Sequence, residues 1–221
     1  MSALDELEIE LTEQIKLISA EFIARYFPAN PEHGPDVYHQ HVKAYCILAH
    51  AAFEEFVERV SLYLMTAAVE NWYQGKLITR PLLSLLLFYK LSIDFVQDEE
   101  TDQPRNFDAL RQVIDEVKRA HSTAIFDNHG FSLKYLRSVL TPVAIDISSD
   151  PVVSNSLRTL ADARGSYAHT SAKLANFTDR SKAKQPMSPE KARDVVEDCL
   201  QLCKKISGDA RKYCAAQGDT A

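Results

Sequence analysis

Arg164 and His169 are the residues whose types and spacing best suit chemistry on an anionic substrate. A histidine titrates near neutral pH and can move a proton, and an arginine can hold an oxyanion through two N–H groups. Gly165 follows the arginine directly, inside a predicted helix, where glycine costs about 1 kcal/mol relative to alanine. We therefore expect either a close approach to the backbone at Gly165 or a bend in the helix.

Other catalytic arrangements fit the sequence less well. Asp162, Ser166 and His169 share one helix face, but side chains stacked along one helix do not reach the geometry of a Ser-His-Asp triad. The sequence has no Gly-rich phosphate loop, GxSxG or HExxH motif. We expect no cofactor.

A second group of polar residues is the cluster Asp36, His39 and His41. His39 and His41 are two positions apart and would leave a helix on different faces. We expect a solvated helix start there and no bound metal.

The apolar pattern predicts helices throughout. An a/d-like stripe predicts an amphipathic helix over residues 3–26; it comprises Leu4, Leu7, Leu11, Ile15, Ile18 and Phe22. A long helix over 36–74 has a core stripe of Cys46, Ala49, Phe53, Phe56, Val57, Val60 and Leu64. Apolar residues also occupy its other side, so it should be buried on several sides or in a subunit interface.

Further helices are predicted over 81–96, 107–124, 133–140, 151 to the mid-170s and 189–215, with a solvated loop over 97–105 and a turn over 127–130. The whole reads as an all-α, single-domain bundle of six or seven helices. Its longest apolar run, residues 82–89, is too short to span a membrane.

The acidic N-terminal residues do not resemble a signal peptide. The four cysteines lack CxxC spacing and read as small buried apolar residues. We expect a reducing, cytoplasmic location.

The formal net charge is −6, but the charges are unevenly distributed. Residues 158–212 hold 12 basic and 7 acidic residues, and the rest of the chain holds 13 basic and 24 acidic residues. A local electropositive strip that includes Lys173 therefore lies just downstream of Arg164 and His169.

These residues resemble the HEPN superfamily, whose signature is Arg-x(4–6)-His in a late helix of an all-α domain. Arg164-Gly-Ser-Tyr-Ala-His169 matches it. Residues 131–147 (FSLKYLRSVLTPVAIDI) and 156–160 (SLRTL) are similar to the approach to that motif in the RiboL-PSP-like branch. Residues 49–56 (AHAAFEEF) resemble the first core helix of the family. The resemblance covers about 40–215 and implies one HEPN-like domain over 1–221, with an N-terminal helix over 1–26 and a core over 36–215.

The resemblance implies a metal-independent endoribonuclease that acts as a homodimer. His169 would accept the ribose 2′-hydroxyl proton or protonate the leaving 5′-oxygen, and Arg164 would hold the phosphate. Five residues along a helix turn the side chains about 140° apart, so two copies across a two-fold axis would share the site. Ser166, Tyr167 and Lys173 would contact the RNA, with core packing as the alternative for Tyr167.

Glu54 is the expected helper acid. On a helical wheel Glu54 and His50 border the core stripe, whereas Glu55 and Glu58 lie away from it. A helper acid would orient an arginine or histidine at the cleft. The alternative for Glu54 is a solvated carboxylate.

The leading hypothesis is thus a ribonuclease that serves as a toxin or effector in bacterial defence, with RNA as substrate and no membrane association. The alternative is a non-catalytic HEPN scaffold that binds a cognate antitoxin or nucleotidyltransferase. Gly165 favours this alternative, because the family commonly has Asn or Asp after the arginine. A helical ligand-binding regulator is a third, weaker option.

Overall fold

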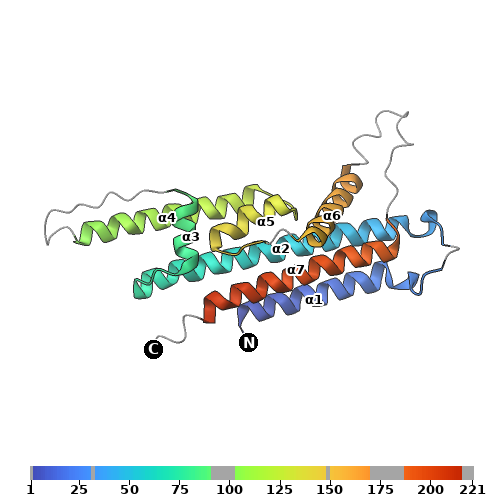
Figure 1. Ribbon diagram of the computed structural model, residues 1–221, viewed down its shortest axis with the longest axis horizontal. Helices are drawn as coiled ribbons and strands as arrows, with labels where there is room; N and C mark the ends of the chain where they lie inside the picture. Colours follow the sequence, from blue (N-terminus) through green and yellow to red (C-terminus); the bar gives the residue numbers. More distant parts are fainter. Residues whose placement is uncertain (1, 31–32, 91–102, 148–149, 170–186, 216–221) are drawn as a thin grey trace. The chain divides into compact units, whose positions relative to one another are not determined.

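The computed structural model describes residues 2–30, 33–90, 103–147, 150–169 and 187–215, without the side chains of 103–105, 166–169 and 215. Every regular element in these ranges is a helix, which confirms the predicted all-α bundle. The elements are α1 (Ala3–Phe22), η1 (Ala24–Tyr26), α2 (Pro35–Gly75), α3 (Arg80–Phe88), α4 (Gln103–Asp127), α5 (Leu133–Leu140), η3 (Thr141–Val143), α6 (Pro151–His169) and α7 (Pro189–Ala215) (Figure 1).

The chain divides into two compact units. Unit 1 comprises residues 1–56, 130–133 and 148–207, and unit 2 comprises 57–129, 134–147 and 208–221. The long helices α2 and α7 each contribute residues to both units. α6, which carries Arg164, belongs to unit 1.

In unit 1, α1 begins at a capping box: Ser2 Oγ accepts the Asp5 N–H, and Asp5 Oδ2 accepts the Ser2 N–H. Its predicted stripe is buried at Leu4, Leu7, Leu11 and Ile15, and half-buried at Ile18 and Phe22. Tyr45 of α2 is hydrogen-bonded to Ser19 of α1 and lies near Glu197 and Arg193 of α7, so the three helices pack around this phenol. Burial raises the pKa of Tyr45 well above its usual value.

Unit 2 packs the rest of α2 against α3, α4 and α5. One core cluster comprises Ala68, Val69, Trp72, Leu82 and Ile114. A buried polar network lies around His121. Ser61 Oγ donates its one proton to the Val139 carbonyl at 2.7 Å, so it must accept from His121 Nε2, which lies 2.9 Å away. The other ring nitrogen, His121 Nδ1, accepts from Tyr89 OH at 3.0 Å. Every polar atom of the His121 ring is thus bonded, and burial lowers the pKa of His121 to about 4.

The predicted core stripe of α2 is buried in full, from Cys46 to Leu64. On the opposite side Met65 is buried, whereas Leu48 and Ala51 are exposed. The segment predicted as a turn over 127–130 begins at the last residue of α4, and Gly130 in it has φ +142°, a backbone conformation that glycine adopts without a steric penalty.

Several predicted boundaries were wrong. The helix predicted over 3–26 ends as α1 at Phe22 and is followed by the 3₁₀ helix η1, and the helix predicted over 107–124 runs as α4 over Gln103–Asp127. The third helix ends at Phe88, not 96, because Lys90 adopts a left-handed backbone at φ 53°; residues 91–96 lie outside the described part. The predicted loop over 97–105 runs too far, because α4 already begins at Gln103. Pro104 stands in its first turn, where the missing N–H removes no helical hydrogen bond.

Candidate functional site

α6 holds Arg164 through a well-defined helix start and a buried inner face. Asp150 Oδ1 accepts the Val152 N–H at 2.8 Å, which caps the helix ahead of Pro151. Ser156 Oγ donates to Asp198 Oδ2 of α7 at 2.6 Å. Leu157, Leu160 and Ala163 are buried on the same helix, and Arg164 is half-buried.

His50 is a buried residue of α2 whose two ring nitrogens have different roles. The Phe131 N–H donates to His50 Nε2 at 3.1 Å, so in the neutral ring the proton is on Nδ1. That Nδ1 lies 3.5 Å from Oε2 of Glu54, one helical turn further on. His50 therefore has a backbone donor on one side and a carboxylate on the other.

Phe131 reaches His50 because of the glycine turn before it. Its ring stacks on Phe53 with centroids 5.1 Å apart, and it makes a T-shaped contact with His50, with centroids 6.3 Å apart. The 127–130 turn with its positive-φ Gly130 thus delivers a backbone N–H and an aromatic ring to the same face of α2.

Arg164 completes this group, which we call the His50 cluster: His50, Glu54, Phe131 and Arg164. Burial, and after it the positive charge of Arg164, lower the pKa of His50 to about 4. The Arg164 guanidinium is thus within electrostatic reach of the buried ring. At neutral pH His50 is uncharged, and the cluster holds one cation and one carboxylate around a neutral donor.

The other predicted site residues are placed as follows. Ser166, Tyr167 and His169 lie in the last turn of α6, with side chains outside the described part, and Lys173 lies outside it altogether. Arg164 and His169 lie five residues apart on one continuous helix. Glu54 is placed beside His50, with its side chain 14% exposed. These roles remain predictions.

Gly165 does not behave as expected. α6 continues through it, and a Cβ built there would meet no atom of the described residues within 4 Å. The predicted close approach to the backbone is therefore absent from the part of the chain that the structure covers.

Sequence reasoning missed the role of His50, which it noted only as a neighbour of the core stripe. The available signal was its four-residue spacing from Glu54, which places both on one face. The third partner, the Phe131 N–H, comes from 81 residues away, and no local pattern could have shown it.

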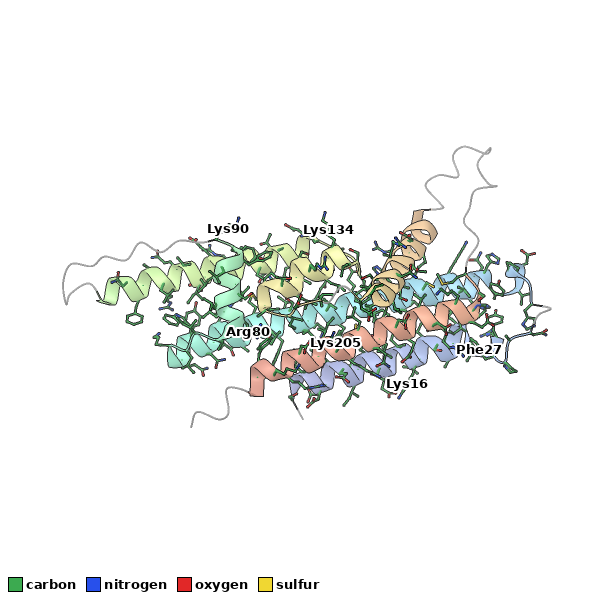
Figure 2. The ribbon with its side chains drawn as sticks, viewed as in Figure 1. Lys16, Phe27, Arg80, Lys90, Lys134 and Lys205 are labelled. Atoms are coloured by element: carbon green, nitrogen blue, oxygen red, sulfur yellow. The ribbon has the colours of Figure 1, made fainter. Side chains whose placement is uncertain are left out.

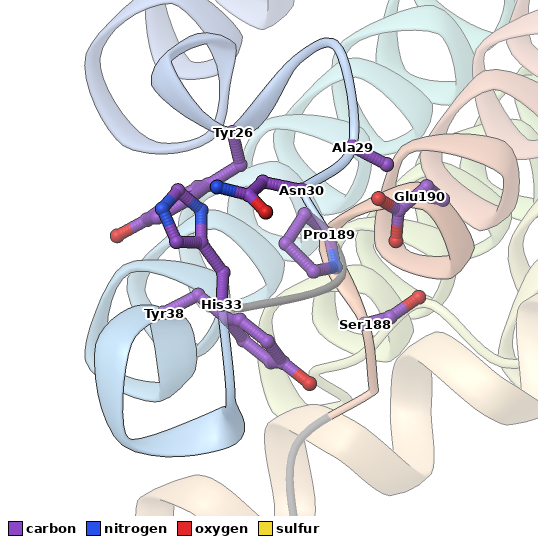
Figure 3. A pocket seen from close by; sticks show the side chains of 8 residues that line it. All are labelled: Tyr26, Ala29, Asn30, His33, Tyr38, Ser188, Pro189 and Glu190. Carbon is purple, nitrogen blue, oxygen red and sulfur yellow. The ribbon is translucent and has the colours of Figure 1, made fainter.

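A separate pocket of about 290 Å³ lies in unit 1 around η1 and the start of α7 (Figure 3). It is lined by Tyr26, Ala29, Asn30, His33, Tyr38, Ser188, Pro189 and Glu190. Tyr26 OH donates to the Val37 carbonyl at 3.1 Å and lies 2.5 Å from His41 Nδ1. The backbone N–H of Glu190 and the Ser188 hydroxyl lower the pKa of Glu190. No member of the His50 cluster lines this pocket.

His41 is thus occupied by Tyr26, and it is half-buried rather than solvated. Among the described residues, Asp36, His39 and His41 do not bring their ligand atoms together as a metal site would require. Cys46, Cys199 and Cys203 are buried, as predicted, whereas Cys214 is only half-buried. Burial raises the pKa of the Cys46 thiol to about 12.

Within the described ranges, the helices all fall short of the length and apolar character that crossing a bilayer demands. No curated protein and no solved structure shows significant similarity to the chain. The family model described as RiboL-PSP-HEPN, in contrast, matches residues 5–210. That match spans α1 to α7 and nearly all of the sequence, and the chain therefore belongs to the RiboL-PSP-HEPN family.

Proposed function

We propose that the protein is a metal-independent endoribonuclease whose composite active site forms in a homodimer. The observation that carries the proposal is the His50 cluster. The helix with the Arg-x4-His sequence holds its arginine within electrostatic reach of a buried, neutral histidine that is itself beside Glu54. A guanidinium held in this way is suited to bind a phosphate in a fixed position.

The reaction is attack of a ribose 2′-oxygen on the adjacent phosphorus. His169 accepts the 2′-hydroxyl proton, the 2′-oxygen bonds to phosphorus, and the bond from phosphorus to the 5′-oxygen breaks. The partner's His169 protonates the departing 5′-oxygen, and Arg164 stabilises the charge on the non-bridging oxygens. The products are a 2′,3′-cyclic phosphate and a 5′-hydroxyl.

The homodimer supplies what one helix cannot. Arg164 and His169 diverge by about 140° on α6, whereas an isologous two-fold interface brings the same short segment of two copies together. Ser166, Tyr167 and Lys173 border the same segment and are proposed to contact the RNA. We further propose that the enzyme is cytoplasmic and acts as a toxin or effector in bacterial defence.

Cleavage of RNA in the presence of EDTA tests the proposal. The wild type should release 2′,3′-cyclic phosphate ends, and Arg164→Ala and His169→Ala should release none while still folding and dimerising. Arg158→Ala is the matched control, because Arg158 is an exposed arginine of the same helix whose hydrogen-bond partner among the described residues is Asn155. A metal requirement, or normal cleavage by His169→Ala, would contradict the proposal.

The second candidate is a non-catalytic scaffold for an antitoxin or a nucleotidyltransferase. Exposed apolar side chains on α3 favour it: Leu83, Leu87 and Phe88 are 49%, 68% and 44% exposed. A groove of about 350 Å³ in unit 2 is lined by Leu83, Leu87 and Arg80. Figure 2 labels Arg80. A stable complex with a protein encoded next to this one, lost in Leu87→Asp, and no nuclease activity would support the scaffold instead.

A further inference from the structure

A shallow pocket of about 200 Å³ lies in unit 2, where the end of α2 meets the start of α4. It is lined by Trp72, Tyr73, Lys76, Phe107, Asp108 and Arg111. The pocket thus gathers three aromatic rings, two cations and one carboxylate. None of these residues belongs to the His50 cluster.

The rings and cations are layered on one another. Trp72 and Phe107 stack with centroids 6.2 Å apart and planes 28° from parallel. Lys76 Nζ lies 5.4 Å from the Trp72 ring, and the Arg111 guanidinium lies 5.5 Å from the Tyr73 ring. Trp72 is only 4% exposed, whereas Phe107 is 50% exposed, so Phe107 presents ring surface to solvent at the outer end of the stack.

The two cations are available for a ligand. Tyr73 OH donates to Asp115, so that carboxylate already has a partner. Neither Lys76 nor Arg111 forms an ion pair with a carboxylate among the described residues. Lys76 Nζ donates to the Tyr73 carbonyl at 3.5 Å, and Arg111 is hydrogen-bonded to the Tyr73 side chain. Both side chains are exposed, and an ammonium with three donors and a guanidinium with five keep further N–H groups to bond an anion.

The position of Lys76 follows from a strained backbone. Lys76 follows α2 at φ 56°, the left-handed conformation in which helices usually place glycine. Its N–H bonds to the Trp72 carbonyl at 2.9 Å, and the Leu77 N–H bonds to the Asn71 carbonyl at 3.4 Å, which closes the helix end. A lysine at this position carries its ammonium back over the last turn of α2 and onto Trp72.

We propose that this pocket binds single-stranded RNA outside the active site, with one base stacked on Phe107 and the backbone phosphate held by Lys76 and Arg111. Aromatic platforms beside cations are how proteins hold single strands without strict sequence preference. The Asp108 carboxylate can accept a hydrogen bond from a base amino group at the edge of the pocket. This inference rests on the proposed function, because it takes RNA as the substrate.

Binding of a non-cleavable RNA tests it. The probe is a fluorescein-labelled 2′-O-methyl RNA of about ten nucleotides, which has no 2′-hydroxyl and cannot be cut by 2′-oxygen attack. Trp72 is the chain's single tryptophan, so its fluorescence reports on this pocket alone. Saturable quenching of Trp72, at the affinity given by the anisotropy of the probe, is the expected result.

The variants separate stacking from charge. Phe107→Ala should weaken binding about tenfold, the order expected for one stacked base, without changing its salt dependence. Lys76→Gly with Arg111→Gln should reduce the slope of log affinity against log salt by about 0.7, the value for one phosphate of a single strand that is no longer neutralised. Glycine suits the left-handed backbone at 76, so this variant removes the charge without harming the fold.

Two matched controls come from α4 itself. Phe126→Ala removes another exposed phenylalanine, and Lys118→Gln removes another exposed cation; both should bind like the wild type. An unchanged Trp72 signal, or wild-type binding by the pocket variants, would overturn the inference. So would quenching by a polyglutamate peptide and not by the RNA. If the pocket binds RNA but the wild type cuts none, only the proposed function fails; if cleavage occurs and the pocket is inert, only this inference fails.

Discussion

Nδ1 of His50 lies 3.5 Å from Oε2 of Glu54, and His50 Nε2 on the other side of the ring accepts the Phe131 N–H. A buried imidazole with both nitrogens engaged acts as a spacer that fixes the carboxylate on one side and the Phe131 backbone on the other. The positive charge of Arg164 acts on the same imidazole and lowers its pKa. We therefore regard His50 as a positioning residue.

Replacing His50 should lower both stability and cleavage. His50→Ala leaves the buried Phe131 N–H without an acceptor, which should reduce the free energy of unfolding by about 1–3 kcal/mol in urea denaturation. His50→Gln should recover part of that loss, because its side-chain oxygen can accept the same N–H. His129→Ala is the control, since that histidine is 65% exposed. Equal stability of His50→Ala and wild type would refute this role.

Stability should fall as the pH drops below about 6.5. Burial lowers the pKa of His50 and of His121 to about 4 in the folded state, whereas unfolded histidines titrate near 6.5. Between these values the unfolded chain binds more protons, so the free energy of unfolding falls by roughly 3 kcal/mol for each histidine. Urea denaturation from pH 7 to pH 4.5 measures the effect, and His121→Gln should reduce the slope by about half. A flat profile would show that neither histidine is buried in neutral form.

Gly165→Ala should stabilise the protein. A Cβ at this position meets no described atom within 4 Å, and alanine is favoured over glycine in a helix by about 1 kcal/mol. Thermal unfolding of the two proteins makes the comparison, with Ala163→Gly as the reverse change on the same helix. If Gly165→Ala is destabilised instead, another surface covers this face in the assembled protein.

Thiol reactivity should be confined to one cysteine. Cys46, Cys199 and Cys203 are buried, and burial raises the pKa of all three thiols, so none offers a thiolate at neutral pH. Cys214 is half-buried. Native protein at pH 7 should therefore give at most one reactive thiol with a disulfide reagent, and four in urea. Cys214→Ser should abolish the native reaction; two or more fast thiols would contradict the packing of α2 and α7 in unit 1.

The expected single domain over 1–221 predicts one cooperative unfolding transition. Residues of α2 and α7 belong to both units, so either unit can unfold alone only by breaking two continuous helices. Circular dichroism follows all helices, whereas Trp72 fluorescence follows unit 2 only. The two signals should give the same midpoint in urea. Separate midpoints would divide the chain into two domains.

The sequence predicted elements best where local chemistry marks both ends. The helix predicted over 133–140 has those bounds as α5, and Pro151 and Pro189 begin α6 and α7 as expected. The start of α4 at Gln103 escaped prediction because its first turn is polar and has no apolar periodicity. The end of α3 escaped because the left-handed Lys90 interrupts a sequence that remains apolar beyond it.

The parts of the site that lie within a single helix could be predicted from the sequence. The four-residue spacing of His50 and Glu54, and the single helix under Arg164 and His169, follow from the sequence. The approach of Arg164 to His50 does not, because it depends on how α6 packs in unit 1. The RNA pocket also escaped, since Trp72 and Phe107 come from helices separated by α3.

The left-handed backbone at Lys76 also gives relatives of this chain a diagnostic position. If stability alone were under selection at this position, relatives should carry glycine or asparagine in place of Lys76, because both adopt the left-handed conformation at lower cost. A lysine or arginine retained there across the family would instead record selection for positive charge. The evolutionary history of this single residue can thus separate a binding surface from an ordinary helix end.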